Sequence, residues 1–105
     1  MREVDLAEFA AAHADGAVAV DVREPFEYVE GHVPGVRSVP LAQLPTVVGE
    51  LPRNRPVYVI CASGSRSLSA AQFLARAGVD ARSVRGGTGG WARSGRPVVT
   101  GADTR

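Results

Sequence analysis

The sequence predicts an α/β domain in which a parallel sheet carries helices on both faces. Short β-rich runs, such as residues 17–22 and 57–60, alternate along the chain with segments of helical pattern. These runs are apolar throughout, which is typical of strands that are covered on both faces. Strands that are separated by helices favour parallel pairing.

The first half of the chain opens with a predicted helix. Asp5 can cap this helix, which turns Leu6, Phe9 and Ala10 toward the core and ends before Gly16. The segments that follow are a strand, a short helix that opens on proline, a loop and a short strand, at residues 17–22, 25–29, 31–35 and 36–39.

The second half begins with a helical segment at residues 41–51. Pro45 and Gly49 should interrupt it, so we expect two short pieces. The remaining predicted elements are a strand, a helix that stops at Gly78, a second short strand and a glycine-rich stretch leading to Trp91, at residues 57–60, 68–77, 82–84 and 86–90.

Length and composition fit one ordinary globular domain. The chain has 105 residues, 45% hydrophobic content and a formal net charge of +1, which is enough material for one compact core and too apolar for a disordered protein. We expect residues 1–105 to form a single domain, with a loose polar tail from about residue 100 to residue 105.

Several classes of partner and site are not expected. The chain has no basic stripe interleaved with aromatic residues, so we predict no nucleic-acid partner. It shows no signal peptide and no apolar run of membrane-spanning length, so we predict no membrane contact and a cytoplasmic location. One cysteine and two distant histidines cannot build a zinc site, and we expect neither a metal nor another cofactor.

The only cysteine, Cys61, is the main candidate for chemistry. It ends the run at 57–60 and opens a loop of small residues that leads into a helical pattern. Such a strand, loop and helix can hold an anion, because backbone N–H groups point inward and the helix start adds partial positive charge. The thiol there should have a lowered pKa, so that it acts as a nucleophile at neutral pH. The alternative is an inert cysteine buried in the core, and such a cysteine would need no loop of this kind.

Three motifs carry a family resemblance. The first, in the amino-terminal half, comprises Asp21-Val22-Arg23-Glu24, Glu27 and Gly31-His32-Val33-Pro34-Gly35. The second is the loop Cys61-Ala62-Ser63-Gly64-Ser65-Arg66-Ser67. The third, near the carboxyl end, comprises Gly86-Gly87, Trp91 and Gly95-Arg96-Pro97. In this order and spacing the motifs resemble rhodanese-homology domains. The resemblance implies a rhodanese-like three-layer fold with a parallel five-stranded sheet, and sulfurtransferase chemistry through a cysteine persulfide.

The resemblance also implies partners and steps. The Cys61 thiolate would take the outer sulfur of a small anionic donor such as thiosulfate and release sulfite. The persulfide would then pass its sulfur to a thiol, cyanide or protein acceptor. Many rhodanese loops place a basic residue directly after the cysteine, where this chain has Ala62. That departure favours another persulfide or a protein donor over thiosulfate.

Within the loop, we expect Cys61 and Arg66 to be catalytic. Arg66 would attract an anionic donor, unless its side chain points outward. Gly64 would allow unusual backbone angles, and Ser67 either caps the helix or touches substrate. The remaining substrate-binding residues would act mainly through backbone N–H groups, and they are Ala62, Ser63 and Ser65.

Other residues are predicted to support the structure. Asp21 and Arg23 should form a buried hydrogen-bonded pair at the sheet edge, and His32 should anchor a loop. Trp91 should anchor the core or a lid, and His13 should face solvent. The pair Gly86 and Gly87 belongs to the third motif, and its spacing does not match a dinucleotide-binding loop.

Two alternatives to a sulfurtransferase remain open. The first is a cysteine phosphatase or arsenate reductase of related fold. Such phosphatases place one more residue between cysteine and arginine, whereas only four residues separate Cys61 from Arg66. The second is a non-catalytic module that binds a partner through the same surface. The presence of both Cys61 and Arg66 argues against this hypothesis.

Overall fold

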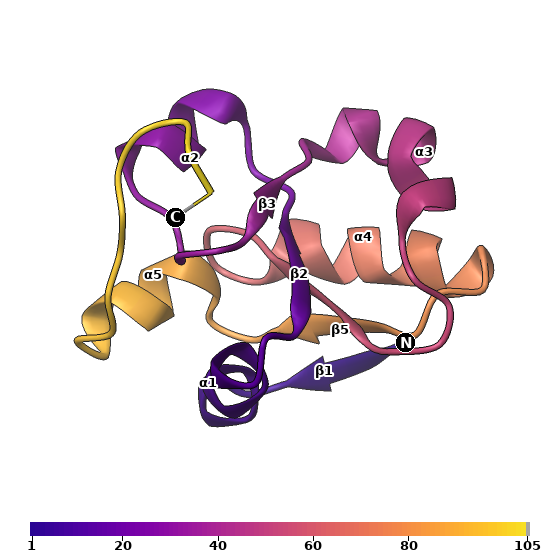
Figure 1. Ribbon diagram of the computed structural model, residues 1–105, viewed down its shortest axis with the longest axis horizontal. Helices are drawn as coiled ribbons and strands as arrows, with labels where there is room; N and C mark the ends of the chain where they lie inside the picture. Colours follow the sequence, from indigo (N-terminus) through magenta and orange to yellow (C-terminus); the bar gives the residue numbers. More distant parts are fainter. Residues whose placement is uncertain (105) are drawn as a thin grey trace.

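A parallel five-stranded sheet lies between two layers of helices in the computed structural model, which describes residues 1–104 (Figure 1). The strand order is β1-β5-β4-β2-β3, and every neighbouring pair is parallel. The predicted three-layer α/β fold is therefore confirmed. The strands are β1 (Arg2–Val4), β2 (Val18–Asp21), β3 (Arg37–Ser38), β4 (Val57–Ile60) and β5 (Ala81–Val84).

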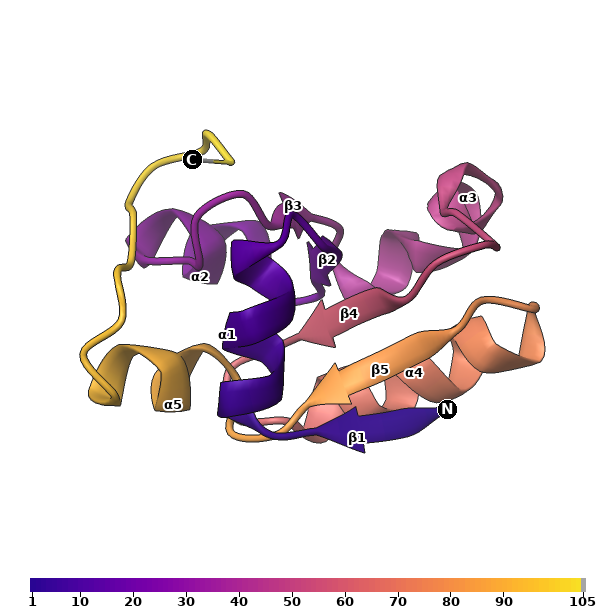
Figure 2. The ribbon, with the colours of Figure 1, turned by 60° about the horizontal axis from the view of Figure 1, so that its bottom comes forward.

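Helices cover both faces of the sheet. Figure 2 shows α1 in front of the strands and α4 behind them. The α-helices are α1 (Leu6–Ala14), α2 (Pro25–Glu30), α3 (Leu44–Val47), α4 (Ser65–Arg76) and α5 (Gly87–Arg93). Short 3-10 turns at Leu41–Gln43 and Val48–Glu50 flank α3. No helix within residues 1–104 is long and apolar enough to cross a membrane.

The sheet separates two hydrophobic cores, and β4 contributes to both. Val57 and Val59 pack in one core with residues of α3 and α4, among them Leu74. Tyr58 and Ile60 point the opposite way and pack with residues of α1 and α5. Successive side chains of a strand alternate between faces, so a central strand with a core on each side must be apolar at every position.

Two predicted helix starts are confirmed by local contacts. Asp5 accepts a hydrogen bond from Glu8 N at 2.8 Å, and the Glu8 side chain reaches back to Asp5 N, which completes a capping box. Pro25 occupies the first turn of α2, where its missing N–H costs nothing.

One strand was not predicted from the sequence pattern. Strand β1 is three residues long and pairs with β5 at the sheet edge. Only Val4 of this strand is buried, so it has no periodicity to detect. It forms because β5 offers a free row of hydrogen-bonding groups.

The start of α4 was predicted too late. The helix begins at Ser65 rather than Leu68, with Gly64 as its N-cap residue at φ +117°. The cap expectation for Ser67 is therefore wrong, because Ser67 lies inside the first turn. Serine and arginine carry no apolar period, so the pattern could not reveal this turn.

Two further boundaries differ from the prediction. The glycine stretch before Trp91 is helical, because Gly86 caps α5 and the helix begins at Gly87. Pro45 does not interrupt a helix but lies in the first turn of α3, so the 41–51 segment forms three short pieces instead of two.

The segment after α5 runs back to α2, as the yellow trace shows in Figures 1 and 2. Val99 forms an antiparallel bridge with His32, and Gly101 N donates to Val29 O at 2.8 Å. Gly35 N donates to Thr104 O. The polar tail predicted from about residue 100 thus forms backbone hydrogen bonds with the rest of the chain as far as Thr104. Arg105 lies outside the described residues.

Asp21 and Arg23 form a buried ion pair where β2 ends. Asp21 is 0% exposed and Arg23 is 6% exposed. Arg23 Nε donates to Asp21 Oδ1 at 3.0 Å, and Nη2 donates to Oδ2 at 2.9 Å. The same Nη2 donates to Gly31 O at 2.8 Å. The pair therefore ties the end of β2 to the loop after α2.

We expect the Arg23→Met variant to lose about 3–5 kcal/mol of unfolding free energy, because it leaves the Asp21 carboxylate buried without a cation. Adding Asp21→Asn should restore part of that loss, since a neutral amide costs less to bury. Equilibrium urea unfolding measures both changes. A double variant no more stable than Arg23→Met would contradict an unpaired charge as the cause.

Candidate active site around Cys61

Cys61 leaves the carboxyl end of β4, and its side chain is fully buried. Gly64 N donates a hydrogen bond to the sulfur at 3.1 Å. The thiol also lies 3.5 Å from Ser67 Oγ, to which it donates. The sulfur is therefore enclosed by polar groups of the loop and of the first turn of α4.

These groups shift the acidity of the thiol. Burial raises the pKa of Cys61, because the thiolate loses hydration. In the ionised state, hydrogen bonds to the sulfur from the Ser67 side chain and from the N–H groups of Ser67, Gly64 and Ser63 outweigh this effect, so the pKa is lowered from its ordinary value of 9.0. The result is the activated thiol that a nucleophilic cysteine needs.

Ser67 connects the sulfur to the neighbouring strand. Its hydroxyl donates to Gly64 O at 3.1 Å and lies 2.9 Å from Ser83 Oγ of β5. Ser67 and Ser83 are both 0% exposed. Sequence reasoning missed Ser83, whose one signal was a small polar residue in an otherwise buried strand. When the sulfur is ionised, the single Ser67 hydroxyl proton must turn from Gly64 O to donate to it.

The amino end of α5 supports the loop from behind. Thr88 N donates to Cys61 O at 2.8 Å, and Gly89 N donates to Ala62 O at 3.0 Å. Gly87, the first residue of α5, has φ +60°, and a Cβ there would lie 2.5 Å from Cys61 O. Only glycine fits this position, which gives Gly87 a definite role in the geometry of the loop.

Arg66 does not stand free for an anion in this structure. Its two terminal nitrogens donate to Glu27 of α2, with Nη1 to Oε1 at 2.7 Å and Nη2 to Oε2 at 2.9 Å. The Arg66 side chain is 36% exposed and that of Glu27 is 20% exposed. Sequence reasoning gave Glu27 no role in the site, because no local pattern links residues so far apart in the chain.

This ion pair acidifies the carboxyl group. Hydrogen bonds from Arg66 lower the pKa of Glu27 from 4.5 to about 2, against the opposing effect of burial. A carboxyl pKa that is lower in the folded state stabilises the fold above pH 4.5. That contribution is lost as the pH falls from 4.5 toward 2.

Trp91 is a residue of α5, and its ring packs on α1, edge-on to Phe9 and His13 at centroid distances of 5.4 and 5.3 Å. Its Nε1 donates to Pro97 O at 2.7 Å. The expectation that His13 faces solvent is wrong, because its Nε2 lies 2.6 Å from Pro34 O and its ring packs on Trp91. Helix α1 faces α5, so this side of it is covered.

His32 is fully buried in the loop after α2. Its ring stacks on Tyr28 at 3.7 Å, and its Nδ1 lies 2.8 Å from Tyr28 O. Its backbone pairs with Val99. The structure therefore places His32 in packing contacts of this loop, and the sulfur contacts of Cys61 come from other residues.

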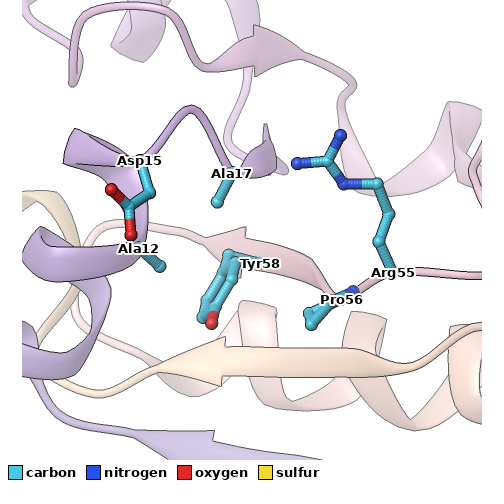
Figure 3. A pocket seen from close by; sticks show the side chains of 6 residues that line it. All are labelled: Ala12, Asp15, Ala17, Arg55, Pro56 and Tyr58. Atoms are coloured by element: carbon cyan, nitrogen blue, oxygen red, sulfur yellow. The ribbon is translucent and has the colours of Figure 1, made fainter.

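Among residues 1–104, no three His, Cys, Asp or Glu side chains are grouped so that they could hold a metal ion. A shallow pocket of about 210 Å³ opens near the amino ends of β2 and β4 (Figure 3). Its lining residues are Ala12, Asp15, Ala17, Arg55, Pro56 and Tyr58. Cys61 leaves the other end of β4, so this pocket is separate from the thiol.

Comparisons with known proteins agree with the observed fold. A family model for the rhodanese-like domain matches residues 5–94. A protein from Allochromatium vinosum named sulfurtransferase is 35% identical over 89 residues, which cover 84% of this chain and 83% of that protein. A rhodanese-related protein from Thermoplasma volcanium has a solved structure with a TM-score of 0.88 and 33% identity, covering 96% of this chain and 100% of that one.

A further similar structure carries a description that names a different activity. A protein of unknown function from Rhodopseudomonas palustris, described as a possible tyrosine phosphatase, has a TM-score of 0.83 and 26% identity. The match covers 93% of this chain and 84% of that one. Similarity of fold therefore leaves the reaction to be argued from the residues around Cys61.

We expect Gly87→Ala to lower the unfolding free energy by about 3 kcal/mol or more, because its Cβ would collide with the Cys61 carbonyl. Gly86→Ala is the matched control. Gly86 also has a positive φ, at +85°, but its Cβ would meet only ordinary contacts, so a loss of about 1 kcal/mol is expected. Urea unfolding compares the two, and equal losses would contradict the proposed collision.

Removing the Ser67 hydroxyl should weaken the nucleophile. We expect Ser67→Ala to raise the pKa of Cys61 and to slow its alkylation by iodoacetamide at pH 7 by about threefold to tenfold. Ser69→Ala, at an exposed position of the same helix, serves as the control. The pH dependence of the alkylation rate gives the pKa directly, and an unchanged profile in Ser67→Ala would exclude this hydroxyl from thiolate stabilisation.

Proposed function

Because this chain belongs to the rhodanese-like domain family, we propose that it is a sulfurtransferase that moves a sulfane sulfur through a persulfide on Cys61. The observation that carries the proposal is the environment of the sulfur. The only cysteine of the chain follows the end of β4, and its sulfur has a lowered pKa and hydrogen-bond partners in Gly64 and Ser67 at the start of α4.

The reaction would proceed by double displacement. The Cys61 thiolate attacks the outer sulfur of a donor such as thiosulfate, a new S–S bond forms, and the old S–S bond breaks as sulfite leaves with its electron pair. An external thiolate or cyanide then attacks the outer sulfur of the persulfide and restores the Cys61 thiolate. Because the chain has one cysteine, an internal disulfide cannot compete with this second step.

The loop stabilises both anionic states. The groups that lower the pKa of the thiol favour a negative charge on sulfur, and the persulfide is also an anion. Cys61 is 0% exposed, so a donor reaches the sulfur only when neighbouring atoms move aside. We further propose a cytoplasmic setting, where thiol acceptors are kept reduced.

A phosphatase is the second candidate, which the Rhodopseudomonas palustris relative brings into consideration. In such a reaction Arg66 would bind the phosphate oxygens. Here both terminal nitrogens of Arg66 bond to Glu27, and the Glu27 carboxylate would repel a phosphate. Attack on a sulfane sulfur depends first on the Cys61 thiolate, which the loop stabilises, so the geometry favours sulfur transfer.

Incubation with thiosulfate should add the mass of one sulfur atom to Cys61, and cyanide should remove it. Intact-protein mass spectrometry with peptide mapping measures both steps. We expect Cys61→Ala to show no adduct and Ser63→Ala, which keeps the backbone N–H, to retain it. A Cys61→Ala variant with undiminished sulfur transfer would refute the proposed role. Phosphate release from an aryl phosphate by the wild-type chain, without any adduct, would favour the phosphatase.

A further inference from the structure

Building on the proposed function, we infer that Glu27 is a specificity-determining residue that selects against highly charged sulfur donors. Its carboxylate occupies the guanidinium of Arg66 and so cancels a positive charge that an anionic donor would otherwise use. The site should then prefer donors of lower negative charge.

The contact between the two side chains is bidentate and well aligned. Each terminal nitrogen of Arg66 donates to a different oxygen of Glu27, at 2.7 and 2.9 Å. Two parallel charge-assisted hydrogen bonds make this one of the stronger ways in which a guanidinium holds a carboxylate. An incoming anion therefore meets a guanidinium whose positive charge is already balanced by the Glu27 carboxylate.

Glu27 is also held in place from its own helix. Its Oε1 accepts a hydrogen bond from Glu24 N at 3.0 Å, as part of the capping interaction that starts α2. The carboxylate is therefore positioned before any ligand arrives, so little side-chain entropy is lost when it pairs with Arg66.

The pair lies close enough to the thiol for their charges to interact. Arg66 stands in the first turn of α4, whose N-cap residue, Gly64, donates to the sulfur. The hydrogen bonds to Glu27 are the main cause that raises the pKa of Arg66, and the charge of Cys61 raises it further. Glu27 remains ionised down to a pH of about 2, so its charge is present whenever the thiolate exists. A donor thus meets a negative sulfur beside a neutral ion pair.

The first test uses two small alkylating reagents that differ in charge. Iodoacetate is an anion and iodoacetamide is neutral, and the single cysteine makes Cys61 the only thiol. Both reagents react with the same thiolate, so the ratio of their rates does not depend on the fraction of Cys61 that is ionised. The ratio therefore reports the charge around the sulfur. We expect Glu27→Gln to raise the iodoacetate-to-iodoacetamide ratio by about tenfold, the order expected for one unit charge within several ångströms at a partly exposed site.

Two further variants identify the source of the effect. Glu30→Gln removes one negative charge from an exposed position of the same helix, and its ratio should stay near that of the wild type. Adding Arg66→Ala to Glu27→Gln should return the ratio to the wild-type value or below. An unchanged ratio in Glu27→Gln would show a merely structural contact, and a lower ratio would mean that Glu27 positions Arg66 for anions. Either result overturns the inference.

The second test compares two sulfur donors. Thiosulfate is a dianion and benzenethiosulfonate is a monoanion, and both leave one sulfur on a thiolate. Glu27→Gln should raise the ratio of kcat/KM for thiosulfate over benzenethiosulfonate in parallel with the alkylation ratio. If the alkylation ratio rises while neither donor loads Cys61 in any variant, the sulfurtransferase proposal fails and charge selection by Glu27 stands.

Discussion

The conformation of the Cys61 loop depends on two backbone hydrogen bonds from α5. Thr88 N and Gly89 N hold the carbonyl groups of Cys61 and Ala62, and the absence of a side chain at Gly87 allows this close approach. These two hydrogen bonds fix the backbone at the start of the loop. In this conformation the N–H group of Gly64 donates to the sulfur. The acidity of the thiol thus depends partly on a helix whose hydrogen bonds go to the loop backbone.

Two ion pairs at the carboxyl side of the sheet illustrate different uses of the same chemistry. Asp21 and Arg23 are buried, so separating them would leave an uncompensated charge in the interior. Glu27 and Arg66 are partly exposed, and pairs of this kind contribute little to stability because water replaces each partner at low cost. The first pair therefore matters for stability, whereas the second matters mainly through the charge that it cancels beside the loop.

Sequence patterns predicted the elements whose residues are apolar with a clear period. Strand β4 and the helix after the loop were found this way, and the resemblance supplied the fifth strand. The pattern could not reveal β1, which buries only Val4, or the first turn of α4, whose start is set by Gly64. It also could not pair Glu27 with Arg66, because that contact depends on how α2 and α4 are placed by the sheet.

The groups around the sulfur stabilise one negative charge on the sulfur itself, but they offer little attraction to a donor that brings further negative charge. The thiolate is stabilised by oriented N–H and O–H groups, whose dipoles act over a short range. The fixed positive charge of Arg66 would act over a longer range, but Glu27 neutralises it. A site with strong local dipoles and no net positive charge from this pair can hold a thiolate or a persulfide without strongly attracting a polyanion. This balance is what distinguishes holding a sulfur atom from binding a phosphate.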